Sequence, residues 1–271
     1  MTILVTGGTG LVGARLLPRL VAEGLDCRAL VRAGKAAPSG VTLVEGDLSE
    51  PESLARAVEG VSAVIHLAAL FRTHDEAGVW KTNHDGTLNL IAATKAHAPG
   101  ARFLMASTGL VYHNGVGRPG REDDTPSPTL AYPASKLAAE TALRASGLTW
   151  SILRLAFVYG EGDGHLESTP RLFASTGRHP AQAFSMVHHR DVAAAVGLAL
   201  QGAMDGRVVN IADEAAITAY EITRLVGEPM EPSTEPLPDP WMGQMDGSLA
   251  RTLGFQPTLR TVYQAIQEGA L

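Results

Sequence analysis

Short apolar runs alternate with amphipathic stretches from residue 3 to residue 155 of this 271-residue chain. The apolar runs lack the polar residue at every second position that a half-exposed strand carries, which is typical of strands buried on both faces of a parallel sheet. The alternation therefore predicts an α/β fold with a doubly wound parallel sheet. The strand candidates are Ile3–Thr6, Cys27–Val31, Val41–Glu45, Ala63–Leu67, Arg102–Ala106 and Thr149–Leu155. The helix candidates between them are Leu11–Glu23, Pro51–Val58, Val79–His97 and Thr129–Ala145.

Two features interrupt this pattern. Pro18 lies in the middle of the first helix and is predicted either to kink it or to be offset by packing, since an interior proline costs about 3 kcal/mol. After Tyr159 the alternation ends, and the proline-rich segment Glu228–Trp241 is predicted to be an extended loop. The later helix candidates are Arg190–Ala203 and Leu259–Glu268.

The composition limits the class of protein. Hydrophobic residues make up 45% of the chain and charged residues 18%, which excludes a wholly disordered, collagen-like or coiled-coil chain. The net charge of −6 argues against broad nucleic-acid binding. Cys27 is the single cysteine, which fits a reducing compartment. The apolar stretch Val61–Phe71 is too short to span a bilayer, and the first residues do not resemble a signal peptide. We therefore expect a cytoplasmic protein with no membrane or nucleic-acid partner.

A glycine-rich segment, TGGTGLVG at residues 6–13, joins the first strand to the first helix. Gly7, Gly10 and Gly13 recur at three-residue intervals in it. Residues without a Cβ allow a tight turn and let a pyrophosphate approach the backbone N–H groups of a helix N-terminus, and Gly13 would allow that helix to pack closely on the sheet. We expect a dinucleotide here; the alternative is a glycine-rich turn that binds no ligand.

The end of the second strand indicates which dinucleotide binds. An NAD site places an acid there to bind the ribose hydroxyls, but the strand ends ALVR at residues 29–32, and Asp26 lies at its opposite end. Arg32 is placed to bind a 2′-phosphate through paired hydrogen bonds, with Lys35 to assist; the alternative is a solvated surface arginine. We favour NADP(H) as the cofactor, with NAD(H) as the alternative.

Other polar residues offer weaker signals. Asp47 and Leu48 follow the third strand and are candidates to contact the adenine, although a helix cap at Asp47 or Ser49 is the alternative. The adjacent His188 and His189 would point to opposite faces of a strand, and no Cys/His cluster has zinc spacing. We therefore predict no metal site.

Tyr132 and Lys136 are spaced to share one helix face. An unperturbed tyrosine titrates near pH ~10, and a nearby ammonium would lower its pKa toward the range of a useful acid or base. Pro133 is tolerated if it lies in the first helical turn. The fifth strand ends at Ser107 and Thr108, where a hydroxyl would hold a substrate carbonyl beside Tyr132. Thr108 is the preferred residue and Ser107 the alternative; a strand-end hydroxyl that only satisfies backbone groups is the alternative to a catalytic role.

Nine stretches, in order and almost from end to end, carry a family resemblance: TGGTGLVG (6–13), GDL (46–48), HLAA (66–69), TNHDGTLNL (82–90), STGLVY (107–112), YPASK (132–136), RLAFVYG (154–160), HHRDVA (188–193) and LGFQP (253–257). On these motifs the chain resembles the extended short-chain dehydrogenase/reductase superfamily, also called the NAD-dependent epimerase/dehydratase family. The resemblance implies a Rossmann-type doubly wound parallel sheet over residues 1–158, to which 184–212 return. It also implies a small C-terminal α/β substrate lobe, formed by 159–183 and 213–271.

The resemblance also implies roles for single residues. Tyr132 would be the general acid/base, Lys136 would lower its pKa and bind the nicotinamide ribose, and Thr108 would complete the catalytic set. Asn83 matches a family asparagine that is usually structural and close to the nicotinamide. The full set of expected cofactor-binding residues is Gly7, Thr9, Gly10, Leu11, Val12, Gly13, Arg32, Asp47, Leu48, Leu67, Ala68, Ala69, Asn83, Tyr132 and Lys136.

Three departures from the nucleotide-sugar members of the family bear on function. Phe157 stands where many of them carry an asparagine that contacts substrate phosphates, Val31-Arg32 replaces the acid of the second strand, and the chain is short. They favour an NADP(H)-dependent reductase of a small carbonyl compound, or a dehydrogenase of the alcohol. The alternatives are a nucleotide-sugar epimerase/dehydratase that recycles NAD in place, and a dinucleotide-binding scaffold without activity. Homodimerisation through a helix bundle is a further family expectation.

Overall fold

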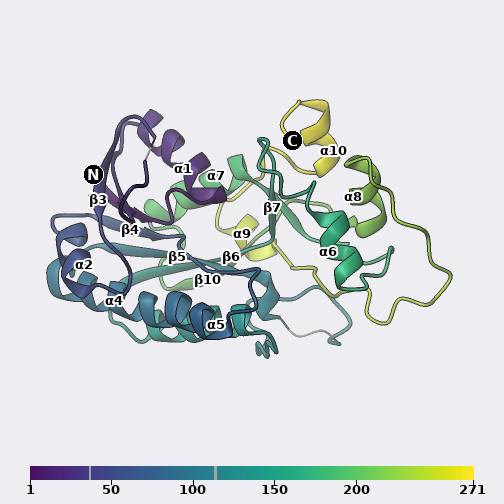
Figure 1. The fold of residues 1–271 in the computed structure, drawn as a ribbon, viewed down its shortest axis with the longest axis horizontal. Coiled ribbons are helices and arrows are strands. Elements are labelled where there is room, and N and C mark those ends of the chain that lie inside the picture. The colour runs from purple at the N-terminus through teal and green to yellow at the C-terminus, as the bar shows by residue number, and fades with distance from the viewer. Residues whose placement is uncertain (37, 113–114) are drawn as a thin grey trace.

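The computed structural model describes residues 1–36, 38–112 and 115–271. In these ranges seven strands form one sheet in the order β10-β6-β5-β4-β1-β2-β3, and all of its neighbouring strands run parallel (Figure 1). The strand order reverses beside β1, which in such sheets marks the place where a ligand binds at the carboxyl ends. The doubly wound α/β fold predicted from the sequence is confirmed. The strands are β1 (Thr2–Thr6), β2 (Asp26–Val31), β3 (Val41–Glu45), β4 (Ala63–His66), β5 (Arg102–Thr108), β6 (Thr149–Leu155) and β10 (Arg207–Ile211).

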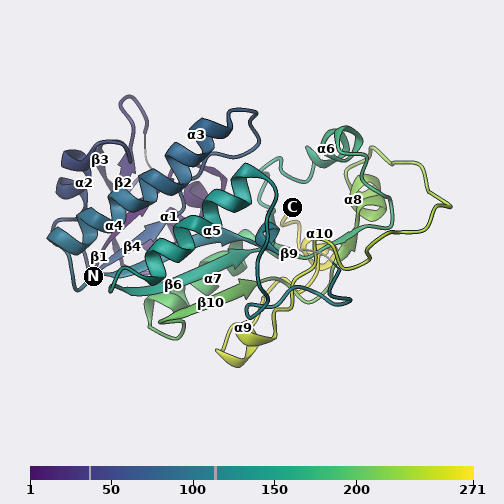
Figure 2. The ribbon, with the colours of Figure 1, turned by 90° about the horizontal axis from the view of Figure 1, so that it is seen from below.

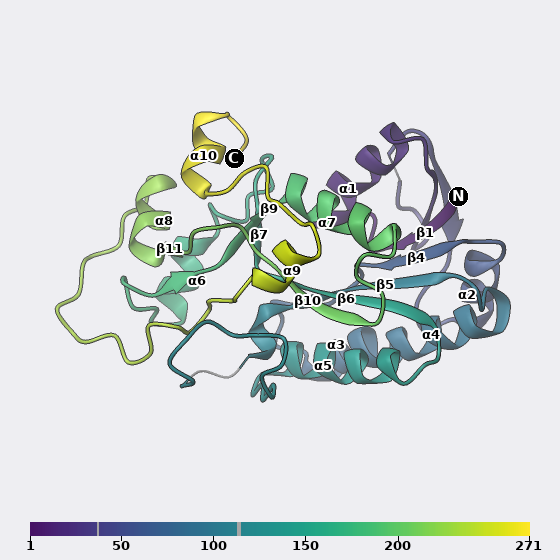
Figure 3. The same ribbon diagram turned by 180° about the vertical axis from the view of Figure 1, so that it is seen from behind.

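Helices cover both faces of the sheet, as Figure 3 shows from behind. One core joins the sheet to α1 and α7, and a second core joins its other face to α2, α4 and α5. Burial on both faces explains why the central strands read as unbroken apolar runs. The helices of these layers are α1 (Leu11–Ala22), α2 (Pro51–Val58), α4 (Gly86–His97), α5 (Ala131–Arg144) and α7 (His189–Leu200).

The chain departs from a predicted helix over residues 79–97. The helix predicted over 79–97 is divided into α3 (Glu76–Trp80), the π-helical turn η1 (Lys81–Asp85) and α4, because the sequence periodicity does not reveal a local change of hydrogen-bond register. Helix α1 runs through Pro18, which is exposed, so that the carbonyl deprived of its N–H partner is on the solvent side.

A third core lies beyond the carboxyl ends of the large sheet, around α6 and α8, as Figures 1 and 2 show. It buries Tyr159, Phe173 and Ile222 together with residues near the end of the chain. In contrast, Ala250 and Phe255, from the segment assigned to the predicted substrate lobe, belong to the core of α1 and α7. Two short strand pairs, β7 (Phe157–Tyr159) with β9 (Met186–His188) and β8 (Ala183–Phe184) with β11 (Ile217–Thr218), lie outside the large sheet. The remaining helices are η2 (Gly109–Val111), α6 (Thr169–Ser175), α8 (Ala219–Leu225), α9 (Ser248–Thr252) and α10 (Val262–Gln267).

Of the helices in the described ranges, none is both long enough and apolar enough to cross a membrane.

Candidate active site

One cavity of about 1500 Å³ opens at the carboxyl ends of the strands and extends to the third core. Single ligand pockets usually measure about 300–1,000 Å³, so this volume suits a dinucleotide together with a second molecule. The cavity brings together every residue of the predicted site except Asn83. These residues are Gly7, Thr9, Gly10, Leu11, Val12, Gly13, Arg32, Asp47, Leu48, Leu67, Ala68, Ala69, Thr108, Tyr132 and Lys136.

The glycine turn between β1 and α1 requires residues without side chains. Gly7 has φ +73°, and a Cβ there would lie 2.6 Å from the backbone nitrogen of Ala68. A Cβ on Gly13 would lie 2.3 Å from the Gly7 carbonyl oxygen. Gly10 is the N-cap of α1 and provides no side-chain cap, and the first helical turn contains no acid. The backbone N–H groups of this turn therefore suit an anionic group such as a pyrophosphate.

Arg32 directly follows β2, is exposed, and lines the cavity together with Lys35. Asp47 lies nearby on the cavity wall, and its carboxylate accepts hydrogen bonds from the backbone nitrogen (2.9 Å) and the hydroxyl (2.7 Å) of Ser49. These two hydrogen bonds are the main cause that holds the pKa of Asp47 below its ordinary value, and the charge of Arg32 adds to them. Asp47 therefore stabilises the local turn as well as lining the cavity.

The three predicted catalytic side chains lie close to the end of β5. Thr108 is the last residue of this strand, and Tyr132 and Lys136 lie on the first turns of α5. Pro133 is the third residue of that helix, within the turn that tolerates proline. Lys136 is only 1% exposed, and burial lowers its pKa to about 8, partly opposed by Glu140.

The expected effect of Lys136 on Tyr132 is absent from this structure. Burial raises the pKa of Tyr132 to about 12, and a hydrogen bond with the Thr108 side chain opposes the rise. Desolvation of the phenolate dominates because the phenol lies in the cavity wall. The phenol is therefore protonated at neutral pH.

Ser107, the alternative to Thr108, is held in a buried network behind the site. Its hydroxyl donates to Glu140, whose carboxylate also pairs with Arg154 (2.7 Å). Arg154 contacts the hydroxyl of Tyr112 (3.0 Å), which in turn donates to Asn210 (2.5 Å). Because the Ser107 hydroxyl already donates its hydrogen bond to Glu140, Thr108 is the better candidate to donate one to a substrate.

Two buried residues support the cavity from beneath. The Asn83 amide accepts from the Leu70 backbone nitrogen (2.7 Å) and donates to the Leu70 carbonyl (2.9 Å), so it fixes the segment after β4. His66 is fully buried between the hydroxyls of Thr6 (2.6 Å) and Thr87 (2.8 Å). Burial, with the charge of Lys136, lowers the pKa of His66 to about 3, so it is neutral at pH 7.

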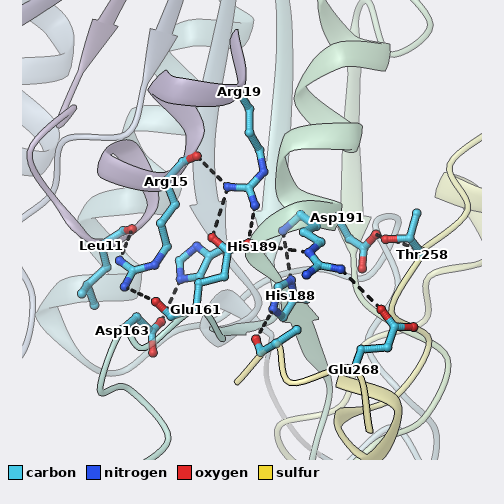
Figure 4. Close-up of polar contacts among 12 residues, drawn as sticks. Leu11, Arg15, Arg19, Glu161, Asp163, His188, His189, Asp191, Thr258 and Glu268 are labelled. Atoms are coloured by element: carbon cyan, nitrogen blue, oxygen red, sulfur yellow. Dashed lines mark hydrogen bonds and ion pairs between the residues drawn. The ribbon is translucent and has the colours of Figure 1, made fainter. Parts of the chain in front are cut away.

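The wall on the side of α7 contains a His–Asp pair that the sequence did not reveal. His189 begins α7 and lies 2.8 Å from the carboxylate of Asp163, with both side chains buried (Figure 4). Burial, the largest single effect, raises the pKa of Asp163, but the hydrogen bonds from His189 and from the backbone of His165, with the charges of these two residues, together hold this pKa below its ordinary value. In the same view, Arg15 and Arg19 of α1 reach Glu161. In the sequence, only the glycines around Asp163 and the His188-His189 dipeptide stood out. Because they lie far apart along the chain, nothing indicated that His189 and Asp163 form a pair.

Among the residues that the structure describes, no group of three or more His, Cys, Asp or Glu side chains is arranged to hold a metal ion.

The comparisons with known proteins agree with this geometry. Residues 3–212 match the model of the NAD dependent epimerase/dehydratase family. The chain belongs to this family. The predicted membership of the extended short-chain dehydrogenase/reductase superfamily, a superfamily of NAD(P)-dependent enzymes, is thereby confirmed.

Relatives in this family carry out different reactions. The chain is similar to a ceramide reductase of Caulobacter vibrioides (33% identity over 71% of this chain and 58% of the relative). It is also similar to a dTDP-6-deoxy-L-talose 4-dehydrogenase (NAD(P)(+)) of Kitasatospora kifunensis (30% identity over 98% of this chain and 93% of the relative). A UDP-glucose 4-epimerase of Thermus thermophilus, solved with NAD, superimposes with a TM-score of 0.77 at 26% identity, covering 96% of this chain and 94% of that one.

Proposed function

We propose that this protein is an NADP(H)-dependent oxidoreductase that reduces a small carbonyl compound, or oxidises the corresponding alcohol. The observation that carries the proposal is that Thr108, Tyr132 and Lys136 line the same cavity as the glycine turn. A cofactor and a substrate can therefore meet at the end of β5.

The residues present fit a dinucleotide. Gly7 and Gly13 leave the space that a Cβ would fill, and the first turn of α1 offers N–H groups without a side-chain cap. When bound, the nicotinamide supplies or accepts the hydride, which is the difficult part of the reaction.

The chain's own residues position the substrate oxygen and move its proton. The hydroxyls of Thr108 and Tyr132 would bind the carbonyl oxygen, and Tyr132 would donate the proton that completes the alcohol. A phenol with a pKa of about 12 is protonated at neutral pH, so it is ready to act as the acid of a reduction. Lys136 lines the same cavity, and its side chain would bind the nicotinamide ribose of the cofactor.

Arg32 and Lys35 support the choice of NADP(H). Both line the cavity beyond the carboxyl end of β2, where an NAD site would carry an acid. A guanidinium there would bind a 2′-phosphate through paired hydrogen bonds. The third core, built largely from the segments 159–183 and 213–271, would form the substrate lobe.

A second candidate is a nucleotide-sugar epimerase or dehydratase that recycles NAD in place. It is favoured by the similarity to the NAD-bound epimerase structure. Phe157 lines the cavity at the position where many such enzymes carry an asparagine, which argues against it. NAD retained through purification, without net consumption of NADPH, would support this second candidate.

The test is Tyr132→Phe, assayed for NADPH-dependent reduction over a panel of carbonyl compounds. Loss of the proton donor should lower kcat by roughly 10²–10⁴-fold. Affinity for NADPH, followed by its fluorescence, should not change, which also shows that the variant is folded. Turnover at the wild-type rate would rule out this role for Tyr132.

A further inference from the structure

Part of the cavity wall, next to the third core, consists of large apolar side chains, and we call this part the chamber. The rings of Phe173 and Phe184 stack there with centroids 5.3 Å apart and an angle of 6° between their planes. Such walls remove water from around an apolar ligand. The chamber is lined by Leu172, Phe173, Phe184, Trp241, Met242 and Met245.

One charged group, Arg178, lies among these side chains. Its backbone nitrogen donates to the Phe173 carbonyl (2.9 Å), and its guanidinium carbon lies 5.6 Å from the centroid of the Phe184 ring. One terminal nitrogen lies 3.9 Å from the sulfur of Met242. Its Nε is buried and has no hydrogen-bond partner among the described residues. The guanidinium is thus held by an aromatic face and a thioether, which leave much of its donor capacity unused.

Within residues 1–36, 38–112 and 115–271, no acidic side chain pairs with Arg178, in contrast to two other arginines of the cavity wall. Arg118 forms two hydrogen bonds with Asp124 (2.9 and 2.6 Å), and the charge of Asp163 acts on Arg72. Burial lowers the pKa of Arg178, and no acidic neighbour opposes this effect. A half-buried charge without a partner costs stability, and an anionic ligand group would offset that cost.

We propose that Arg178 binds a carboxylate of the substrate, and that the substrate is a carbonyl compound with an apolar body and a single carboxylate. The inference rests on the proposed function, because it places the reacting carbonyl at Tyr132 and the carboxylate at Arg178 in one cavity. A planar guanidinium matches one carboxylate through two parallel hydrogen bonds. A diphosphate would bring more negative charge than this unpaired arginine can balance, so a carboxylate suits the chamber better.

The experiment compares a matched pair of ketones, para-acetylbenzoate and its methyl ester, with para-acetylphenyl phosphate as a third member. Reduction by NADPH would be measured with the wild-type protein and with Arg178→Gln, Arg178→Lys and Arg171→Gln. Arg171 lies on α6, is exposed, and does not line the cavity, so its variant controls for the change in net charge. Calorimetric titration of para-acetylbenzoate into each protein gives a readout that does not depend on turnover.

Arg178→Gln should raise KM for para-acetylbenzoate by roughly tenfold or more, as expected for a lost charged hydrogen bond, and change KM for the ester much less. Arg178→Lys should recover only part of this loss because it lacks the paired donors. Equal effects on acid and ester, preference for the phosphate, or no binding of the acid would overturn the inference. Arg178-dependent binding of the acid without reduction of any ketone would overturn the proposed function and leave the carboxylate site standing.

Discussion

The two halves of the cavity are built in different ways. On the cofactor side, eight consecutive residues, 6–13, form the end of β1, the glycine turn and the start of α1, and the groups offered to the ligand are mainly backbone N–H groups. On the chamber side, the lining comes from segments near residues 172–185 and 241–245, and side chains provide both the apolar walls and the charge of Arg178. A site made of backbone tolerates little change at its glycines, whereas a site made of side chains can change its ligand without disturbing the fold. Substitutions on the cofactor side should therefore affect both folding and binding, whereas substitutions on the chamber side should affect binding alone.

Among the variants of this comparison, the largest effect is expected at Gly13, where both folding stability and cofactor binding should fall. In Gly13→Ala the new Cβ would lie 2.3 Å from the Gly7 carbonyl oxygen, so the turn or the start of α1 must shift. Overpacking of this kind costs about 1–3 kcal/mol, and we expect NADPH affinity to fall roughly tenfold to a hundredfold. Fluorescence titration with NADPH measures it. Gly197→Ala is the control, because nothing lies within 4 Å of its new Cβ. Equal affinity in the two variants would show that the turn does not hold the cofactor.

The second variant changes Arg32, the side chain on which the preference for NADPH over NADH is proposed to depend. Arg32→Ala should weaken NADPH binding by roughly tenfold to a hundredfold, the value of a charged hydrogen-bonded contact, and leave NADH binding unchanged. Arg28→Ala, on the preceding strand β2, is the matched control, since Arg28 donates to the Glu59 carbonyl and does not line the cavity. If the wild-type protein bound NADH as tightly as NADPH, the preference for NADP(H) would be wrong and sugar nucleotides would be the first substrates to test.

The same contrast explains what the sequence could predict. Strands β3 and β6 and helix α2 match their predicted ranges, because apolar runs and helix signals are local. The predicted site residues that line the cavity could also be predicted, since each stands in a short motif at a strand end or at the start of a helix. Arg178 was not, because nothing in its neighbourhood in the sequence shows that Phe184 and Met242 pack around it. The pKa of Tyr132 was expected to fall but is raised, because the degree of burial depends on the whole fold.

The free energy of unfolding should depend on pH through His66, which is buried beneath the cofactor side of the cavity. Its pKa is lowered from 6.5 to about 3, so the unfolded chain binds the proton more readily than the folded one between these values. The neutral imidazole therefore contributes stability that is fully present above pH 6.5 and is lost as the pH falls toward 3, by at most about 1.4 kcal/mol per pH unit.

Urea unfolding across this range would measure the slope. His66→Gln retains hydrogen-bonding groups for Thr6 and Thr87 but cannot titrate, so its stability should depend less on pH than that of the wild type. Parallel curves for the two proteins would contradict the assignment, because carboxylates elsewhere would then account for the whole effect.

The smallest effect is expected at Glu161, which connects α1 to the segment that follows β7. Its carboxylate accepts from Arg19 (3.1 Å), its carbonyl accepts from Arg15 (2.8 Å), and its own backbone has φ 57° (Figure 4). The side chain is 21% exposed, so Glu161→Gln should lower the free energy of unfolding by less than about 1 kcal/mol, as partly solvated ion pairs do. Because the Arg15 contact goes to the backbone, α1 should stay in place, and NADPH affinity should change by less than about twofold. Unfolding curves and NADPH titration on the same preparation check both values. A tenfold loss of NADPH affinity would mean that the cofactor turn depends on this connection, so that the two halves of the cavity would have to be treated as one coupled unit.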